Sequence, residues 1–350
     1  MKSTRFLALA ALLGTALPAA AQVTLNGAGA TFPNIIYSNW MLTYNQAHSD
    51  VKLNYQSIGS GGGIRQFSDG TVDFGATDAP MTDSAIAAIG GNVLHIPTVL
   101  GAVVAAYTLP DATQPIRITP DVLADIFLGK VTKWNDARLA SINPDASLPN
   151  QDIIVVHRSD GSGTSFVWTD YLSKVSPEWA QKVGKGPSVN WPVGLGGRGN
   201  EGVAATVRQT PGAIGYIELG YALINKMPFA VLKNQSGNWI TASLESVTAA
   251  AAGAMKDMGP STDFRVSITN SPGAQAYPAS SFTWLLVHKT YSDTAKARAL
   301  VQFIWWAETE GQAKARELGY APLPQGFRPW IQARLKTVTA AGRPVWKTAE

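Results

Sequence analysis

Residues 23–44 read VTLNGAGATFPNIIYSNWMLTY and combine three local signals in one segment. The run Val23–Leu25 is typical of a short β-strand, and the stretch Gly27–Phe32 is typical of a glycine-rich loop. Pro33 suits the first turn of a helix, and apolar residues then recur at helical spacing as far as Tyr44. The segment therefore predicts a strand, a loop and a helix in succession.

The same order recurs along the chain. Strands are predicted at 51–55, 72–76 and 153–156, and two of them lead into further stretches that mix glycine with hydroxyl side chains, Gly59–Gly63 and Asp160–Ser165. Each such stretch is expected to open a helix, whose first backbone N–H groups are unpaired and favour negative charge. Because glycine lets a ligand approach the backbone closely, three such stretches predict a site for a tetrahedral oxyanion.

The chain is long enough for two domains. Two segments are predicted to cross between them: the apolar stretch 93–107, which Pro97 interrupts, and the Gly/Pro/Ser-rich segment 270–277. We therefore expect two α/β lobes joined by a hinge, with a ligand held between them. Further helices are predicted at 118–128, 248–254, 295–306 and 311–318, and further strands at 212–217 and 280–288.

The first residues have the pattern of a cleavable signal peptide. Lys2 and Arg5 precede an apolar run, and Ala19–Ala21 fits a cleavage site, so the mature chain is expected to start near Gln22. The chain has no cysteine, which excludes disulfides, thiolate metal ligands and a lipid-attachment cysteine. We expect a soluble protein of the periplasm.

The overall charge does not favour nucleic acid or a membrane surface as a partner. Lysine and arginine number 28 against 24 acidic residues, and removal of Lys2 and Arg5 lowers the net charge from +4 to +2. A bulk field this weak does not attract polyanions. Any anion binding must therefore come from local geometry.

Catalytic and cofactor signals are poor. The four histidines, His48, His95, His157 and His288, are not spaced as metal ligands, and Ser162 has no nucleophile elbow around it. The series Gly194, Gly196 and Gly199 matches a dinucleotide fingerprint, but residues 190–192 read NWP where a strand is required. We interpret it as a structural loop before a helix near Asn200, and expect no metal, no cofactor and no enzyme.

The stretch Asp160–Ser165 has two interpretations. Asp160 could be the N-cap of a helix that begins with small residues. Alternatively, the N–H groups of Gly163 and Thr164 are aimed at an anion, and Arg158 adds a planar pair of donors beside them. Arg158 favours the second interpretation, in which Asp160 both caps the helix and orients the guanidinium.

Asp78 is the most diagnostic residue of the predicted site. It follows the strand next to the Gly59–Gly63 stretch, so it is expected to lie near Ser60. A carboxylate repels an anion unless the anion carries a proton that the carboxylate can accept. Hydrogen phosphate has such a proton at neutral pH and sulfate does not, so Asp78 predicts a selective site. The alternative is a turn residue before Ala79-Pro80.

Seven motifs in the same order resemble the periplasmic phosphate-binding protein of the high-affinity phosphate ABC importer, over nearly the whole mature chain. The resemblance rests on the motifs at 27–33, 54–60, 72–80, 128–134, 158–166, 191–197 and 211–216. Two departures are Gly61 and Thr77, where the family commonly has serine.

This resemblance implies a two-lobed, type II-like periplasmic binding protein that closes on phosphate, as hydrogen phosphate or dihydrogen phosphate, and delivers it to a membrane permease as a monomer. The expected boundaries are 1–21 for the signal peptide, 22–98 with 272–350 for lobe I, and 99–271 for lobe II. Asp160 is expected to orient Arg158, and Asp78 to accept the phosphate proton. The implied phosphate site comprises Ala30, Thr31, Phe32, Ser60, Asp78, Arg158, Ser162, Gly163 and Thr164.

Two other function classes remain open at this point. A secreted phosphatase or phosphotransferase could use the same oxyanion site, although it would need an activated nucleophile or a metal cluster. An adhesion or matrix protein could reuse the same fold.

Overall fold

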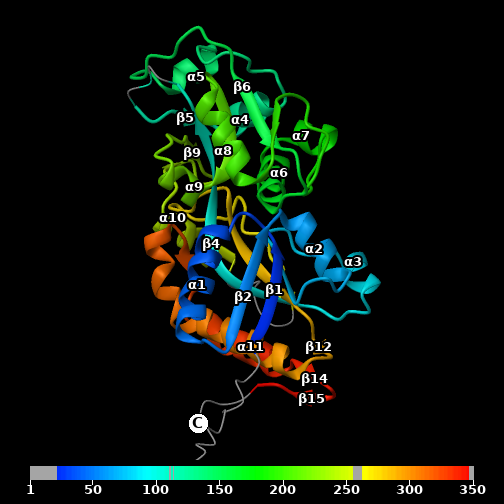
Figure 1. Cartoon of the computed structure of the whole chain (residues 1–350). Coiled ribbons are helices and arrows are strands. Elements are labelled where there is room, and N and C mark those ends of the chain that lie inside the picture. Colours follow the sequence, from blue (N-terminus) through cyan, green and yellow to red (C-terminus); the bar gives the residue numbers. More distant parts are fainter. Residues whose placement is uncertain (1–21, 110–111, 113, 255–261, 347–350) are drawn as a thin grey trace, which may run out of the picture.

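The computed structural model describes residues 22–109, 112, 114–254 and 262–346, and the predicted signal peptide lies outside these ranges. Within them the chain forms two α/β lobes, one above the other in Figure 1. One mixed sheet runs through both lobes in the order β2-β1-β3-β11-β4-β8-β6-β7, with β13 beside β4. Its strands are β1 (Val23–Gly29), β2 (Val51–Ser57), β3 (Phe74–Thr77), β4 (Leu94–Tyr107), β6 (Ile154–Arg158), β7 (Leu195–Gly197), β8 (Ala213–Glu218), β11 (Ser280–Val287) and β13 (Ala321–Pro322).

Strand β4 belongs to both lobes and is buried at every position. Residues Leu94–Ala102 pair antiparallel with β11, whereas Val103–Tyr107 pair antiparallel with β8. The predicted interruption at Pro97 is wrong. Pro97 pairs with Trp284 and Val99 pairs with Thr283, so a bulge at Thr98 lets β4 continue as one strand past the proline. The residue boundaries of the lobes stay a prediction.

In the lower lobe, glycine lets helices pack closely on the sheet. Gly27–Gly29, the first half of the predicted loop Gly27–Phe32, belong to β1, and α2 (Ser60–Ser68) begins inside the glycine stretch Gly59–Gly63. A Cβ atom on Gly63 would lie 2.4 Å from Gly29 Cα, so only glycine allows α2 to approach β1 this closely. The other helices of this lobe are α1 (Asn34–Ala47), α3 (Asp83–Ala88), α11 (Thr294–Thr309) and α12 (Phe327–Lys336).

In the upper lobe, helices pack around β6, β7 and β8 (Figure 1). The predicted helix 118–128 is shorter, because Arg117–Ile118 form β5 and pair with β9 (Val231–Lys233) before the helix begins. The predicted helix near Asn200 is confirmed and follows β7 directly. The helices are α4 (Pro120–Phe127), α5 (Ala137–Ile142), α6 (Gly163–Val175), α7 (Pro177–Lys182), α8 (Gly199–Gln209) and α9 (Leu219–Ile224).

The remaining elements include α10 near the junction and two small sheets, one in the upper lobe and one at the foot of the lower lobe (Figure 1). The predicted helix 248–254 lies within α10 (Leu244–Ala254), whereas 311–318 forms two 3-10 turns in place of a regular helix. Two small sheets complete the fold, with strands β5, β9 and β10 (Trp239–Ile240), and β12 (Thr290–Tyr291), β14 (Thr339–Ala340) and β15 (Arg343–Pro344).

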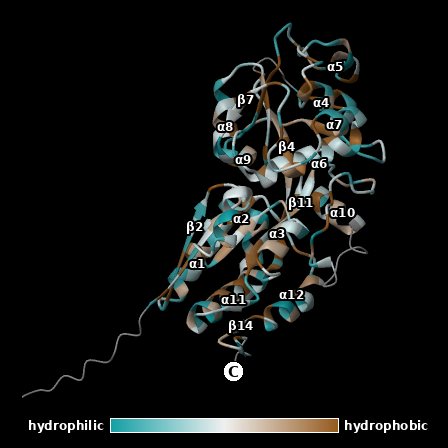
Figure 2. Ribbon diagram, turned by 90° about the vertical axis from the view of Figure 1, so that its right-hand side faces the viewer, coloured by the Kyte–Doolittle hydropathy of each residue, from teal (hydrophilic) through white to brown (hydrophobic). Residues whose placement is uncertain are grey.

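The hydrophobic core is continuous across the junction of the lobes. Buried residues from β4, β8 and β11 belong to one cluster with the aromatic side chains of both lobes, among them Trp40, Trp168 and Trp284. Figure 2 shows the corresponding brown segments along the inner strands, while teal residues lie on the outer helices. The strand ends between the lobes therefore rest on a rigid support.

Candidate functional site

Two tyrosine hydroxyls bind carbonyl oxygens of the loop Ala30–Phe32, which follows β1. Tyr55 donates to the Ala30 carbonyl at 2.7 Å, and Tyr221 of the upper lobe donates to the Thr31 carbonyl at 2.6 Å. In a trans peptide the following N–H points opposite to the carbonyl. These two bonds therefore aim the N–H groups of Thr31 and Phe32 away from the tyrosines.

Some backbone groups of this loop are bonded within the protein and others are not. The Ala30 N–H donates to the Ala76 carbonyl at 2.9 Å, so Ala30 has no free donor to offer. Tyr320 donates to the Phe32 carbonyl at 2.6 Å. Among the described residues, the N–H groups of Thr31 and Phe32 donate to no protein acceptor.

Ser60 and Asp78 meet at the ends of their strands, as the sequence predicts. The Asp78 N–H donates to Ser60 Oγ at 3.2 Å, and Thr283 of β11 donates to Asp78 Oδ1 at 2.9 Å. The other carboxylate oxygen, Asp78 Oδ2, is buried and has no hydrogen-bond partner in the part of the chain that the structure describes. Burial raises the pKa of Asp78 to about 7, against the opposing effects of Thr283, Arg158 and Ser60.

The stretch Asp160–Ser165 leads into helix α6, but the residue that caps this helix differs from the predicted one. Ser162 is the N-cap of this helix, since its Oγ accepts from the Ser165 N–H at 3.0 Å. The prediction that Asp160 caps α6 is therefore wrong. Within the described part of the chain, the N–H groups of Gly163 and Thr164 have no acceptor and stand at the positive end of a 13-residue helix.

Arg158 and Asp160 form a two-point ion pair. The Arg158 guanidinium donates from Nε to Asp160 Oδ1 at 2.7 Å and from Nη2 to Oδ2 at 2.5 Å. The Gly199 N–H, at the start of α8, also donates to Asp160 Oδ1 at 3.0 Å. Burial alone would raise the pKa of Asp160, but Arg158 and Gly199 lower it below its usual value. The remaining Nη1 lies 3.4 Å from Thr164 Oγ1.

Asn200 joins the two lobes at the centre of the site. Its Nδ2 donates to Thr31 Oγ1 at 2.7 Å and to Thr164 Oγ1 at 3.0 Å, while its Oδ1 accepts from the Glu218 N–H at 2.9 Å. Sequence reasoning missed Asn200, although it noted the glycine series that ends at Gly199. It also missed Thr283 and the three tyrosines.

The lobes are in direct contact around this centre. A Cβ atom on Gly163 would lie 2.4 Å from Asp78 Oδ2 and 2.5 Å from Ser60 Oγ. The Gly61 N–H of the lower lobe donates to the Gly161 carbonyl of the upper lobe at 2.9 Å. The polar side chains of the site are almost completely buried: Thr31, Ser60, Asp78, Arg158, Ser162 and Thr164 are at most 3% exposed.

The hydroxyl groups of the site share one feature. Each oxygen already accepts a hydrogen bond: Thr31 and Thr164 from Asn200, Ser60 from Asp78, and Ser162 from Ser165. A hydroxyl has one hydrogen to donate, and within the described ranges none of these four donates it to a protein group. Together with the free N–H groups and Arg158, they form a set of donors around one buried acceptor, Asp78 Oδ2.

Among the described residues, the structure shows no cluster of metal ligands and does not pair His157 with Ser162. Within them, no group of three His, Asp or Glu side chains is placed to hold a metal ion. His157 does not face Ser162: its ring stacks on Trp191 with centroids 5.0 Å apart, and its Nδ1 lies 3.0 Å from the Arg158 carbonyl. No helix in the described ranges is both long and apolar enough to span a bilayer.

The fold and the site define a two-lobed α/β binding protein with a buried set of hydrogen-bond donors between its lobes. Residues 14–308 match the model of the PBP superfamily domain. The chain is 47% identical over 324 residues to the phosphate-binding protein PstS of Xylella fastidiosa strain 9a5c, covering 91% of this chain and 87% of the relative. The chain belongs to the family of PstS phosphate-binding proteins.

Other comparisons agree. The phosphate-binding protein PstS of Pasteurella multocida is 44% identical over 347 residues, covering 98% of this chain and 99% of the relative. A high-affinity periplasmic phosphate-binding protein, PfluDING, solved with phosphate, shares the fold with a TM-score of 0.70, at 18% identity over 89% of this chain and 93% of that one. A phosphate-binding protein of Stenotrophomonas maltophilia has a TM-score of 0.67 at 18% identity, over 90% and 94%. None of these is named as a phosphatase.

Proposed function

We propose that this chain captures inorganic phosphate in the periplasm and delivers it to the membrane permease of an ABC-type phosphate importer. The relatives at 47% and 44% identity are named phosphate-binding proteins, which supports phosphate as the ligand. The observation that carries the proposal is the buried, unpartnered Asp78 Oδ2 among hydrogen-bond donors. We further propose that residues 1–21 are a cleaved signal peptide and that the protein acts as a monomer without catalysis.

Each donor has a proposed role. The hydroxyls of Thr31, Ser60, Ser162 and Thr164 donate to phosphate oxygens, because each accepts a hydrogen bond within the protein and keeps its own hydrogen for the ligand. The N–H groups of Thr31, Phe32, Gly163 and Thr164 add further donors. Ala30 supports the site through its bonds to Ala76 and Tyr55 and gives no donor of its own.

The Arg158 guanidinium supplies a charged hydrogen-bond donor. Asp160 holds it by two bonds, which fixes the plane of the guanidinium and leaves Nη1 directed at Thr164. A charge-assisted hydrogen bond from a fixed guanidinium is stronger than one from a neutral donor. Asp160 is therefore a positioning residue.

Asp78 provides the selectivity. An ionised Asp78 accepts the proton of hydrogen phosphate through Oδ2, whereas sulfate has no proton to offer. Sulfate would bring unpaired negative charges together in a buried place, where their repulsion is poorly screened. The site therefore accepts phosphate and rejects an anion of the same shape.

Isothermal titration of phosphate-free protein tests this function. We expect saturable phosphate binding with a stoichiometry of about one, as a single set of donors implies. Sulfate at the same concentrations should give little heat. Equal heats for the two anions would contradict the selectivity, and no heat for either would contradict the function.

A further inference from the structure

Two arginine side chains line a surface hollow directly outside the buried site. Arg65 of α2 and Arg198, which precedes α8, line one surface hollow of about 440 Å³, together with Ser159 and Asp160. Arg65 belongs to the lower lobe and Arg198 to the upper lobe, so the hollow lies at the boundary between them. The Gly61–Gly161 backbone hydrogen bond between the lobes borders it.

Both arginines are free to hold a ligand. Their side chains are exposed, and among the described residues neither guanidinium forms a hydrogen bond or an ion pair. The carboxylate of Glu201, the acidic residue closest to Arg198 in sequence, lies instead 2.9 Å from the Tyr221 hydroxyl. Two positive charges without partners are therefore left in one hollow.

The Arg158–Asp160 ion pair separates the hollow from the buried site. The Asp160 side chain is 15% exposed and lines the hollow, while its two oxygens are bonded to Arg158. This ion pair compensates the charge of Asp160, so the carboxylate does not cancel the two outer arginines. An anion in the hollow would lie one ion pair away from the buried donors.

We infer that Arg65 and Arg198 form an outer site that holds a tetrahedral dianion at the mouth of the cleft and supplies it to the buried site. This inference rests on the proposed function. The outer site has two guanidinium groups and no partnerless buried carboxylate, so it holds phosphate and sulfate alike. Selection then occurs only at Asp78.

The difference between the sites gives a specific expectation. The outer site increases the rate of phosphate association, because it raises the local concentration of the anion. It has little effect on dissociation, which depends on the buried contacts. Sulfate, although rejected inside, should compete for the outer arginines and slow phosphate association.

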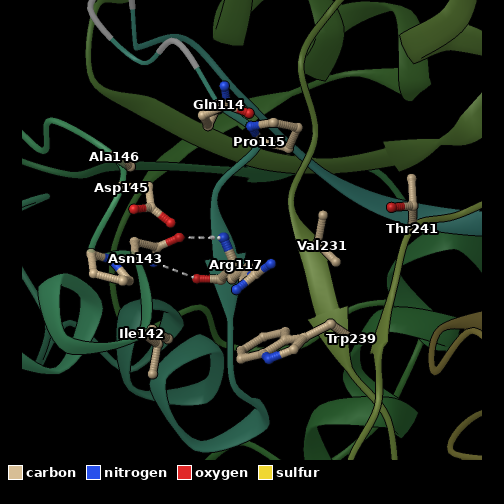
Figure 3. A pocket seen from close by; sticks show the side chains of 11 residues that line it. Gln114, Pro115, Arg117, Ile142, Asn143, Asp145, Ala146, Val231, Trp239 and Thr241 are labelled. Carbon is tan, nitrogen blue, oxygen red and sulfur yellow. Dashed lines mark hydrogen bonds between the residues drawn. The ribbon is translucent and has the colours of Figure 1, made fainter.

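The double variant Arg65→Gln with Arg198→Gln tests the outer site by stopped-flow tryptophan fluorescence. The matched control changes Arg117→Gln and Arg343→Gln, which removes the same charge from both lobes. Figure 3 shows Arg117 in a separate pocket at β5, where its guanidinium lies 5.8 Å from the centre of the Trp239 ring. Arg343 lies in β15, at the foot of the lower lobe (Figure 1).

In the double variant we expect phosphate association to slow by about tenfold at low ionic strength, the lower end of electrostatic steering effects. The dissociation rate should stay the same, and the control variant should behave as the wild type. Replacing chloride by sulfate at constant ionic strength should slow association in the wild type and not in the double variant.

Three results would overturn the inference. If the wild type binds phosphate but both double variants associate at its rate, the arginines have no role and the proposed function stands. If association slows without any effect of sulfate, a diffuse field acts and there is no outer site. If equilibrium titration of the wild type shows no phosphate binding, the proposed function and the inference fall together.

Discussion

At the residue scale, Asp78 controls the chemistry of the site because one oxygen is held and the other is not. Thr283 fixes Oδ1, and Oδ2 is left buried without a partner. An unpaired buried acceptor costs stability unless a ligand pairs with it. In the proposed function, the proton of the ligand supplies this missing partner.

The substitution Asp78→Asn should reduce selectivity. The amide has hydrogens to donate and carries no charge, so it can bond an unprotonated oxygen. We expect the ratio of phosphate to sulfate affinity to fall by at least about tenfold, since a hydrogen bond to a charged group contributes about 1.5–3 kcal/mol. Titration with both anions measures this ratio. Asp50→Asn, at an exposed position of the same lobe, is the control, and an unchanged ratio in Asp78→Asn would remove Asp78 from the mechanism.

The sequence predicts the residues of the site better than their partners. Asp78, Arg158 and the glycine stretches carry local signals, and the structure brings them together. Asn200 and Thr283 carry none. Asn200 meets Thr31 across 169 positions, and Thr283 meets Asp78 across 205, so only the tertiary fold defines these contacts.

At the element scale, helix α6 presents two free N–H groups to the site because Ser162 satisfies a third. The cap bond from the Ser165 N–H holds the first turn in place. Helix α7 offers a natural comparison, since Ser176 caps it through the Trp179 N–H at 3.2 Å.

The substitutions Ser162→Ala and Ser176→Ala should separate capping from binding. Each should lower the free energy of unfolding by about 0.5–2 kcal/mol, the usual effect of losing an N-cap side chain. Only Ser162→Ala should also weaken phosphate binding, because it loses a donor and loosens the first turn of α6. Chemical denaturation and phosphate titration of both variants check this; equal phosphate affinity in the two would show that Ser162 acts only as a cap.

The element boundaries also show where sequence signals are insufficient. Glycine within Gly27–Gly29 and Gly59–Gly63 predicts loops, yet Gly27–Gly29 belong to β1 and Gly61–Gly63 belong to α2. Glycine is needed there because the strand and helix backbones approach each other closely. This requirement comes from tertiary packing, but in the sequence the same glycines resemble a turn signal.

At the scale of the whole molecule, closure of the lobes depends on the missing side chain of Gly163. A methyl group there would meet Asp78 Oδ2 and Ser60 Oγ within 2.5 Å. Gly163→Ala should therefore hold the lobes apart and lower phosphate affinity by at least about a hundredfold, the loss of two charge-assisted hydrogen bonds. Small-angle scattering with excess phosphate should give a larger radius of gyration than the wild type. Gly326→Ala, at a position with no atom within 4 Å of the new methyl group, should close normally.

The stability of the phosphate-free protein should depend on pH through Asp78. Its pKa in the folded protein, about 7, is above the ordinary value of 3.8, so folding takes up a proton between these values. Stability from this group is complete below about pH 4 and is lost as the pH rises to about 7. Thermal or urea unfolding from pH 4.5 to 8 should show a steeper decline in the wild type than in Asp78→Asn.

The comparison between these two proteins isolates Asp78. Burial also raises the pKa of Glu218 and Glu308 and lowers that of His95 and His288, but these groups are present in both proteins. The difference in slope should not exceed about 1.4 kcal/mol per pH unit, because one proton is involved. Identical slopes would mean that Asp78 is ionised in the folded protein throughout this range.

Strand β4 has a mechanical consequence. One unbroken strand of 14 residues forms ladders with β11 in the lower lobe and β8 in the upper lobe. Its peptide groups cannot change partners without breaking a ladder, so opening of the cleft must come from twisting and bending of this strand. Because β4 is paired in both lobes, it resists twisting, and its torsional stiffness limits how far the cleft opens. Unfolding of either lobe removes strand pairing from β4, on which the other lobe also depends. The two lobes should therefore melt together in a single calorimetric transition.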